Sequence, residues 1–256
     1  RIMGNYHLEV QVISRGKGRS VTRLATYISG EKLRDSYFEK TYYHRRQDVL
    51  NCRIFLPPHA PPDFHHLQEL CDAIEAAEVR WDARTAREFK GSLPNELPLY
   101  ELQQIVSAYI NENFVACDLC AIAAIHAGRN PTDHTRDNPH VHIIVPTRTV
   151  TKTGFSKRKD REHDKRAYIH LWREQWAAVQ NRAYERNGLD IRVSHECLAV
   201  QGVNRLPTIH LSRIDWQKEQ RGEHTPAGDL KRHIAERNQI CEQARSKTHD
   251  FSIERT

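Results

Sequence analysis

One run of residues combines turn formers, histidines and a β-branched tail: Asp133-His134-Thr135-Arg136-Asp137-Asn138-Pro139-His140-Val141-His142-Ile143-Ile144-Val145-Pro146. The part from 140 onward favours a β-strand, because β-branched side chains pack well on a pleated surface. Successive side chains of a strand point to opposite faces, so His140 and His142 share one face. The segment therefore predicts a turn followed by a strand that presents two imidazoles side by side.

A second strand is expected just upstream, at Cys120-Ala121-Ile122-Ala123-Ala124-Ile125-His126, and turn formers separate the two. We predict that they form an antiparallel hairpin, which brings His126 beside His140 and His142. Three neutral imidazole nitrogens on one side of a divalent cation leave positions open for a substrate oxygen. The pattern favours a catalytic metal site over three strand-end histidines bonded to backbone or carboxylates. His134 lies in the loop and is not predicted to be a ligand.

The composition fits a folded protein with a polar surface. The 256 residues suit one large domain, or one domain with an extension. Hydrophobic residues make up 38% of the chain and the mean hydropathy is −0.74, so we expect a modest core under a highly charged surface. Lysine and arginine number 39 against 33 acidic residues, for a net charge of +6. This balance permits a polyanionic partner but does not require one.

Membrane spans and disulfide frameworks are not expected. No apolar run approaches the roughly 20 residues that span a bilayer, and no charged and apolar leader opens the chain. We therefore expect a soluble, cytoplasmic protein without a membrane partner. The six scattered cysteines are expected to be reduced thiols. Cys117 and Cys120 have the spacing of a zinc knuckle but lack a second pair, so we do not predict a metal there.

Periodicity predicts the remaining elements. An alternating pattern indicates a strand at 6–13, and strand-like segments follow at 49–56, 86–94 and 191–195. Helical patterns indicate helices at about 21–28, 62–83, 99–115 and 169–186, with Ser20 as the N-cap of the first. Beyond Pro207 the chain turns polar, and 215–249 shows only weak helical periodicity.

Two segments are strongly basic. The glycine-rich loop 14–19 carries arginines and a lysine ahead of a helix start, an arrangement that can hold a phosphate. Between 148 and 173, lysine or arginine stands at 148, 152, 157, 158, 159, 161, 165, 166 and 173. Such a bias beside a metal cluster is typical of a phosphate-backbone footprint, although a charge run is as often a solvated loop.

Two single residues have an ordinary interpretation from the pattern alone. Tyr27 lies four residues after Arg23, at the margin of the apolar face of the first helix. A half-buried packing role is the ordinary interpretation of such a tyrosine. Glu88 is the one acidic side chain of the strand 86–94, and a solvated or salt-bridged carboxylate is its ordinary interpretation.

Six segments along residues 4–211 carry a resemblance to a known family. They are Tyr6-His7-Leu8, Ser20 to Tyr27, Glu88 with Leu93-Pro94, Ile125-His126-Ala127-Gly128, Asn138-Pro139-His140-Val141-His142 and Leu206-Pro207-Thr208-Ile209-His210-Leu211. In this order they resemble the MobA/MobL (MobQ-type) plasmid mobilisation relaxases of the HUH endonuclease superfamily. The histidine motif is the most specific of them, and its combination with an N-terminal tyrosine is hard to obtain otherwise.

The resemblance implies an α+β fold, with an antiparallel β-sheet core flanked by helices in the permuted ferredoxin-like arrangement of the HUH endonucleases. It implies a relaxase domain over 1–211, with 212–256 as a charged, helical extension or a linker to further domains. His126, His140 and His142 would bind a divalent metal, Mn2+ or Mg2+, whose place Ni2+, Co2+ or Zn2+ can take in crystals. The loop between His126 and His140 is longer than in compact relatives and carries its own His134.

The implied activity is that of a DNA relaxase, a site- and strand-specific endonuclease acting at a plasmid origin of transfer. Tyr27 would attack one phosphodiester and form a 5′-phosphotyrosyl intermediate for later religation. We predict that Glu88 orients a ligand histidine or accepts the tyrosine proton. The implied partners are single-stranded DNA or the origin hairpin, accessory mobilisation proteins and a conjugative coupling protein. We predict DNA contacts at Arg15, Lys17, Arg19, Arg23, Arg148, Lys152, Lys157, Arg158 and Lys159.

Two alternatives stay open at this point. A rolling-circle replication initiator uses the same histidine pair and a tyrosine, but that tyrosine typically follows the histidines, whereas Tyr27 precedes them. From a different class, a non-catalytic DNA-binding protein could hold a structural metal with the same three side chains. A covalent adduct on an oligonucleotide that is lost in Tyr27→Phe would exclude the non-catalytic alternative.

Overall fold

The computed structural model describes residues 2–197, 200–201, 206, 208–209 and 211–253. The chain divides into two compact units, Arg1–His195 and Glu196–Thr256. This division lies before the domain boundary expected at residue 211. Within the motif that spans 206–211, Pro207 and His210 lie outside the described residues.

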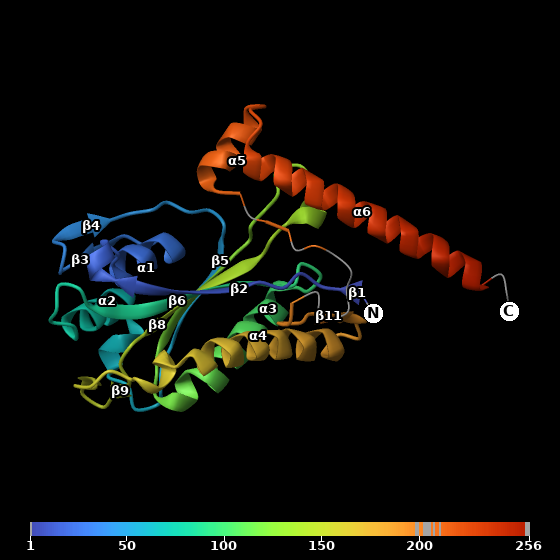
Figure 1. The fold of residues 1–256 in the computed structure, drawn as a ribbon. Coiled ribbons are helices and arrows are strands. Elements are labelled where there is room, and N and C mark those ends of the chain that lie inside the picture. Colours follow the sequence, from blue (N-terminus) through green and yellow to red (C-terminus); the bar gives the residue numbers. More distant parts are fainter. Residues whose placement is uncertain (1, 198–199, 202–205, 207, 210, 254–256) are drawn as a thin grey trace. The chain divides into compact units, whose positions relative to one another are not determined.

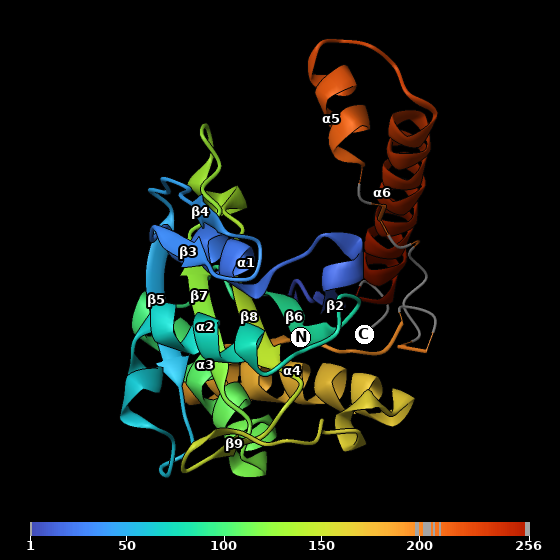
Figure 2. The same cartoon turned by 90° about the vertical axis from the view of Figure 1, so that its left-hand side faces the viewer.

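The first unit is built on a five-stranded antiparallel sheet with the strand order β2-β6-β8-β7-β5. In that order the strands are Leu8–Ser14, Arg84–Ser92, His140–Pro146, Ala121–His126 and Val49–Phe55. Figure 2 shows them side by side, with β8 at the centre. The predicted hairpin of β7 and β8 is confirmed, and its register pairs His126 with His140.

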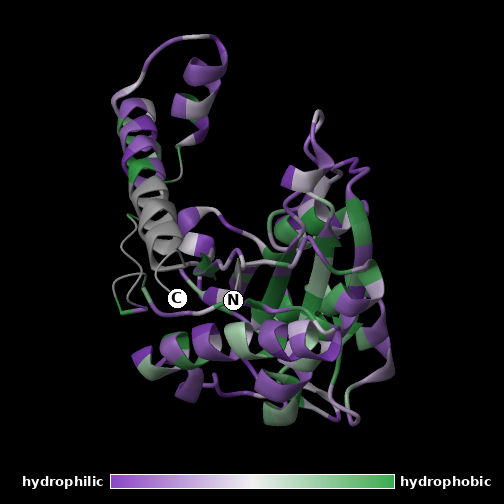
Figure 3. Ribbon diagram, turned by 90° about the vertical axis from the view of Figure 1, so that its right-hand side faces the viewer, coloured by the Kyte–Doolittle hydropathy of each residue, from purple (hydrophilic) through white to green (hydrophobic). Residues whose placement is uncertain are grey.

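Helices cover both faces of the sheet, which explains the apolar runs of its central strands (Figures 1 and 2). The helices α1 (Val21–Ser29) and α2 (Leu67–Ala76) pack on one face. The helices α3 (Leu99–Asn113) and α4 (Arg166–Arg186) pack on the other. All six residues of β7 are buried, and Figure 3 shows apolar strands between more hydrophilic helices. The expected α+β architecture, an antiparallel sheet flanked by helices, is confirmed.

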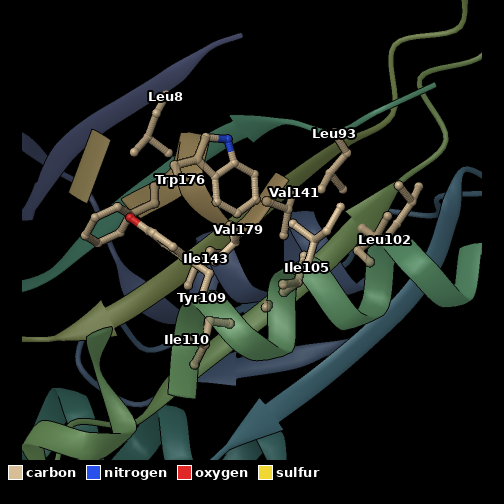
Figure 4. Packing of buried hydrophobic residues seen from close by; sticks show 14 of the residues in the cluster. Leu8, Leu93, Leu102, Ile105, Tyr109, Ile110, Val141, Ile143, Trp176 and Val179 are labelled. Atoms are coloured by element: carbon tan, nitrogen blue, oxygen red, sulfur yellow. The ribbon is translucent and has the colours of Figure 1, made fainter. Parts of the chain in front are cut away.

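The larger core lies between the sheet and the pair α3 and α4, and Figure 4 shows its side chains. Tyr109 and Trp176 are buried there and meet edge to face, with ring centroids 4.9 Å apart. Position 91 of β6 requires glycine, because a Cβ would lie 2.8 Å from the Trp176 ring. This close aromatic packing fixes α4 against the sheet.

Short elements complete the first unit. β3 (Leu33–Asp35) and β4 (Lys40–Tyr42) form one hairpin. β9 (Val150–Thr151) and β10 (Gly154–Phe155) form another. β1 (Ile2–Met3) pairs in parallel with β11 (Ile191–Arg192), so the described start of the chain lies beside the last strand of the unit.

The second unit contains the helices α5 (Arg213–Gln220) and α6 (Pro226–Ile253). The Asn238 side chain bonds the backbone of Leu206 twice, at 2.8 and 2.9 Å. The segment 215–249, whose helical periodicity is weak, thus lies within the two helices α5 and α6 and the turn between them. No helix in the described parts of the chain has the length and apolar character of a membrane span.

A capping residue and a buried ion pair fix the start of α1. Ser20 caps the helix as predicted, since its side chain accepts a hydrogen bond from the Arg23 N–H at 3.1 Å. Behind the cap, Arg15 pairs with Glu75 of α2 at 2.7 Å, and both side chains are buried. The other Glu75 oxygen accepts the N–H of Val21 at 3.0 Å. One carboxylate therefore joins α1, α2 and the loop before α1.

Helix α2 is shorter than predicted. It starts at Leu67, after a 3-10 turn at Pro62–His65, and it ends at Ala76 instead of about residue 83. The carbonyls of Glu78 and Arg80 accept the guanidinium of Arg15 at 2.6 and 3.4 Å. A continuing helix would use these carbonyls for its own N–H groups. The periodicity predicts too long a helix because Arg15, distant in the sequence, donates to these carbonyls instead.

Arg15→Ala should lower the free energy of unfolding by about 3–5 kcal/mol, because it leaves the buried Glu75 carboxylate without its charge partner. Lys17→Ala alters an exposed residue of the same loop and should change that free energy by less than about 0.5 kcal/mol. Urea unfolding followed by circular dichroism measures both variants. Equal and small effects would contradict a stabilising role for the ion pair.

Candidate metal centre and the neighbouring tyrosine

Three histidines meet where β7 ends and β8 begins. One ring nitrogen from each of His126, His140 and His142 lies within 4.8 Å of the other two. The ring centroids are 5.0 to 5.4 Å apart. No other three histidine, cysteine or acidic side chains gather in this way in the part of the chain that the structure describes. This set, the histidine triad, is the one that the sequence predicted.

Backbone carbonyls orient two of the imidazoles. The Nε2 of His126 donates to the carbonyl of Ile28 at 2.8 Å. The Nδ1 of His140 donates to the carbonyl of Asn138 at 2.8 Å. These assignments leave Nδ1 of His126 and Nε2 of His140 unprotonated and able to bind a metal. Such contacts fix the ring direction and raise the basicity of a metal-bound imidazole.

A carboxylate orients the third imidazole. The Nδ1 of His142 donates to Glu88 Oε1 at 3.1 Å, while Arg19 donates to the other Glu88 oxygen at 2.6 Å. Arg19 also donates to the Gln11 side chain and the Val12 carbonyl, both at 3.1 Å. Burial raises the pKa of Glu88, but the bonds from His142 and Arg19 outweigh it and leave the pKa below its ordinary value. Glu88 is therefore ionised, with both oxygens engaged.

The chemistry of the triad fits a divalent cation. The buried Nδ1 of His126 has no hydrogen-bond partner among the described residues, which is costly unless a ligand takes its lone pair. Burial lowers the pKa of His126 to about 4 and also lowers the pKa of His140. Both imidazoles are thus neutral at pH 7, the state that binds metals. Three neutral nitrogens are a donor set that leaves positions open for substrate.

The loop between β7 and β8 depends on one glycine. Gly128 has a φ of +54°, and a Cβ there would lie 2.0 Å from the Asn138 carbonyl oxygen. That same carbonyl accepts the bond from His140. The close approach therefore requires glycine and helps to set the direction of the His140 ring. His134 of this loop is exposed, pairs with Asp137 at 3.4 Å and is not part of the triad.

Tyr27 lies beside the triad, near the end of α1. Its ring meets the ring of His142 edge to face, with centroids 6.1 Å apart. The tyrosine is 43% exposed, so its hydroxyl is accessible from solvent. The next residue, Ile28, accepts the bond from His126, which ties α1 to the triad one residue away from the phenol. The arrangement brings a partly exposed hydroxyl next to the candidate metal ligands.

Two residues that the sequence did not single out contact this tyrosine, and a third binds one of them. His44 meets the Tyr27 ring edge to face, with centroids 5.8 Å apart. The Cζ of Arg46 lies 4.5 Å from the centroid of the same ring. Asp48 binds Arg46 through two bonds of 2.8 and 2.6 Å, and these bonds hold the pKa of Asp48 at about 2. The basic run before β5 was the available signal, but only the fold brings it over Tyr27.

Comparisons with known proteins agree with this geometry. The MobA/MobL family model matches residues 19–221. The chain belongs to the MobA/MobL family. The probable mobilization protein MobA of Bifidobacterium longum (strain NCC 2705) is 29% identical over 251 residues, with 81% of this chain and 43% of that protein covered. The mobilization protein MobL of Acidithiobacillus ferridurans is 29% identical over 273 residues, with 96% and 71% covered.

The fold of this MobA/MobL protein is also found among solved structures. A chain from the work "Molecular Basis of Vancomycin Resistance Transfer in Staphylococcus aureus" superposes with a TM-score of 0.68 at 22% identity. The match covers 76% of this chain and 100% of that one. At this identity the likeness shows the fold alone. The chain spans 43% of the Bifidobacterium relative, so the activity of that longer protein does not follow from identity.

Two of the basic residues predicted to contact DNA have roles inside the MobA/MobL fold. The Arg15 side chain is fully buried against Glu75. This corrects the expectation of a DNA contact at Arg15, because a buried guanidinium cannot reach a phosphate. Arg19 is partly exposed, but its guanidinium pairs with Glu88 at 2.6 Å. Its role in the fold is therefore to orient that carboxylate.

The basic segment after β8 lies away from the triad. It follows the opposite end of β8, roughly 20 Å along the strand from His140, and Figure 2 shows β9 at that end of the sheet. Arg148 and Lys159 both pair with Glu78, at 2.8 and 3.1 Å. The predicted DNA contacts that remain exposed are Lys17, Arg23, Lys152, Lys157 and Arg158. Nearness in sequence to the histidines therefore did not mean nearness in space.

Gly128→Ala should weaken metal binding by about tenfold or more, since a methyl group displaces the carbonyl that orients His140. Isothermal titration calorimetry with Mn2+ measures the change. Gly188→Ala is the matched control, because Gly188 also has a positive φ, of +68°, but nothing lies within 4 Å of a Cβ there. A loss shared by both variants would show that backbone strain, and not the His140 contact, is responsible.

The metal-free protein should lose stability as the pH falls from about 6.5 toward 4. Burial lowers the pKa of His126 from 6.5 to about 4. Between these two pH values His126 is protonated in the unfolded chain but neutral in the folded chain, which favours unfolding. Urea unfolding in the presence of a chelator should show a steeper loss for the wild type than for His126→Gln. His134→Ala, at an exposed position, should follow the wild type. Equal slopes in the wild type and His126→Gln would contradict the buried neutral histidine.

Proposed function

We propose that this protein is a DNA relaxase that nicks one strand at a plasmid origin of transfer and retains the cut end for religation. The observation that carries the proposal is Tyr27, partly exposed and 6.1 Å from the ring of His142. Membership of the MobA/MobL family supports it, since the relatives are named mobilization proteins. A structural metal in a non-catalytic DNA-binding protein would need neither a neighbouring phenol nor open ligand positions.

The reaction would be a transesterification. The Tyr27 oxygen attacks the phosphorus of one phosphodiester, and a new P–O bond forms as the bond to the 3′ oxygen breaks. The products are a 5′-phosphotyrosyl adduct and a free 3′-OH, because the leaving 3′ oxygen takes up one proton while the phenol gives one to a base. The number of phosphodiester bonds is unchanged, so the 3′-OH can later reverse the step. A phenol is a weak nucleophile until its proton passes to a base in the site.

The side chains around Tyr27 would manage that proton and the accompanying charge. Glu88 suits an orienting role better than the role of base, because His142 and Arg19 already engage its two oxygens. His44 is in ring contact with Tyr27 and offers an imidazole as proton acceptor. Arg46, held by its carboxylate partner, brings positive charge to the phenolate and to the phosphate that it attacks.

His126, His140 and His142 would hold a divalent cation, Mn2+ or Mg2+, with Ni2+, Co2+ or Zn2+ as substitutes in vitro. Bound there, the cation would supply charge that polarises the scissile phosphate and offsets the negative charge of the transition state. The three imidazoles are neutral ligands and leave the charge of the cation undiminished. Their hydrogen bonds to Ile28, Asn138 and Glu88 keep the donor atoms in place while DNA binds.

The partner of the site would be single-stranded origin DNA or the hairpin beside the nick, and the nick would be specific for one site and one strand. Arg23 is exposed on α1, one turn before Tyr27, and suits a phosphate close to the nick. The exposed residues Lys17, Lys152, Lys157 and Arg158 suit phosphates farther along the DNA. Such contacts make the affinity fall steeply with salt. Accessory mobilisation proteins and a conjugative coupling protein are the proposed protein partners.

Tyr27→Phe should abolish the covalent adduct while metal and DNA binding stay within about twofold of the wild type, because only the attacking oxygen is removed. The adduct is detected as a mobility shift on a denaturing gel, after incubation with single-stranded origin DNA and Mn2+. Mapping the modified peptide by mass spectrometry identifies the residue.

Tyr43→Phe is the matched control, since Tyr43 is 60% exposed on the connection that carries His44. This variant should form the adduct at the wild-type rate. An adduct that persists in Tyr27→Phe would move the nucleophile elsewhere. A wild-type protein that binds metal and DNA yet never forms an adduct would favour the non-catalytic class.

A further inference from the structure

The turn that follows α2 displays two apolar side chains to solvent. Trp81 is 73% exposed and Val79 is 93% exposed. Neither belongs to the two apolar core clusters of the described residues. Binding can remove the surface of a large exposed aromatic side chain from water, and apolar residues exposed close together mark interaction surfaces.

This turn is held from beneath. The guanidinium of Arg15 donates to the carbonyls of Glu78 and Arg80, at 2.6 and 3.4 Å. The N–H of Arg15 donates to the carbonyl of Ala83 at 3.0 Å, and the N–H of Ala83 donates to Arg80 at 3.2 Å. The fully buried Arg15 thus supports the backbone on both sides of Trp81. An ordered turn displays the indole with little entropy left to lose on binding.

The surroundings of Trp81 are basic. A Cβ on Gly16 would lie 3.6 Å from the indole, which puts Trp81 against the basic loop before α1. On the other side, Lys159 donates to the carbonyl of Arg84 at 2.6 Å, so the segment after β8 reaches the same edge of the sheet. Exposed cations of these three segments include Lys17, Arg80, Arg84, Lys157 and Arg158. One acidic side chain of the turn, Asp82, pairs with Arg80 at 2.8 Å.

Both basic segments singled out in the sequence therefore contact the stretch 81–84, the first at Trp81 and the second at Arg84. Positive charge beside an exposed aromatic ring is the combination that binds single-stranded nucleic acid. The charge complements a polyanion and not an apolar protein partner. This end of the sheet lies roughly 20 Å from the triad along β8.

We propose that Trp81 is a stacking residue for an unpaired base of the DNA whose phosphates lie on the surrounding lysines and arginines. This inference rests on the proposed function, because the DNA is the strand that Tyr27 would cut. Lys17, Lys157 and Arg158 neutralise the backbone, and the indole covers one face of a base. The surface positions the strand at a fixed distance from the triad and does not take part in bond breaking.

Fluorescence anisotropy with a labelled single-stranded oligothymidine of about 30 nucleotides, at low salt and with a chelator present, tests the proposal. Trp81→Ala should weaken binding about tenfold, whereas Trp81→Phe, which keeps an aromatic face, should stay within about threefold. A duplex of the same length should be nearly insensitive to Trp81→Ala, because its bases have covered faces. Trp81 is exposed, so its removal should leave the melting temperature unchanged.

Two matched variants make the result specific. Lys17→Ala should weaken single-stranded and duplex binding alike. It should also reduce the slope of log affinity against log salt concentration by about 1, as expected for the loss of one phosphate contact. Trp216→Ala, at a tryptophan 54% exposed in the second unit, should bind as the wild type does. Tryptophan fluorescence should be quenched by oligothymidine in the wild type and Trp216→Ala, and much less in Trp81→Phe.

Wild-type affinity in Trp81→Ala, or an equal loss for single-stranded and duplex DNA, would overturn the stacking role. The adduct assay keeps this outcome separate from the proposed function. If the Tyr27 adduct forms and Trp81→Ala binds normally, only the inference on Trp81 fails. If Trp81→Ala loses single-strand binding and the wild type forms no adduct, the stacking role of Trp81 is supported and the proposed nicking activity is contradicted.

Discussion

The hydrogen bond from His126 to the carbonyl of Ile28, 2.8 Å long, links the two halves of the candidate site. It determines which ring nitrogen of His126 is free, and it fixes the end of α1 against β7. Because Tyr27 precedes Ile28, the phenol and the triad keep one relative position. The bond that anchors the helix holds the ring proton on Nε2, so the buried Nδ1 of His126, which has no partner among the described residues, keeps its lone pair for a metal.

The sheet makes this bond possible. Strand β7 is buried along its whole length, and its register with β8 places His126 opposite His140. A slip of one residue would turn every side chain of a strand to the other face and separate His126 from His140. The same alternation sends Phe89 into the core beneath α4 and Glu88 toward the triad. Packing on one face therefore determines ligand geometry on the other.

Buried charge organises the opposite end of the sheet. Arg15 and Glu75 fix the start of α1 and also the turn after α2. A residue expected to bind DNA directly thus supports the residues that face solvent around it. The candidate nucleophile lies beside the triad, and the exposed tryptophan lies toward the other end of β8, roughly 20 Å along that strand.

The sequence by itself determined the strands β7 and β8, the three histidines and the N-cap of α1, because alternation, turn residues and capping are local properties of neighbouring residues. A family resemblance assigned catalytic roles to Tyr27 and Glu88. Their contacts with His142 became visible only in the fold. The tertiary structure decided that Arg15 is buried, that α2 stops at Ala76, and that His44 and Arg46 cover Tyr27. Those outcomes depend on partners dozens of residues away in the sequence. Local periodicity carries no information about which distant side chain will donate a hydrogen bond to a carbonyl or pack against a ring.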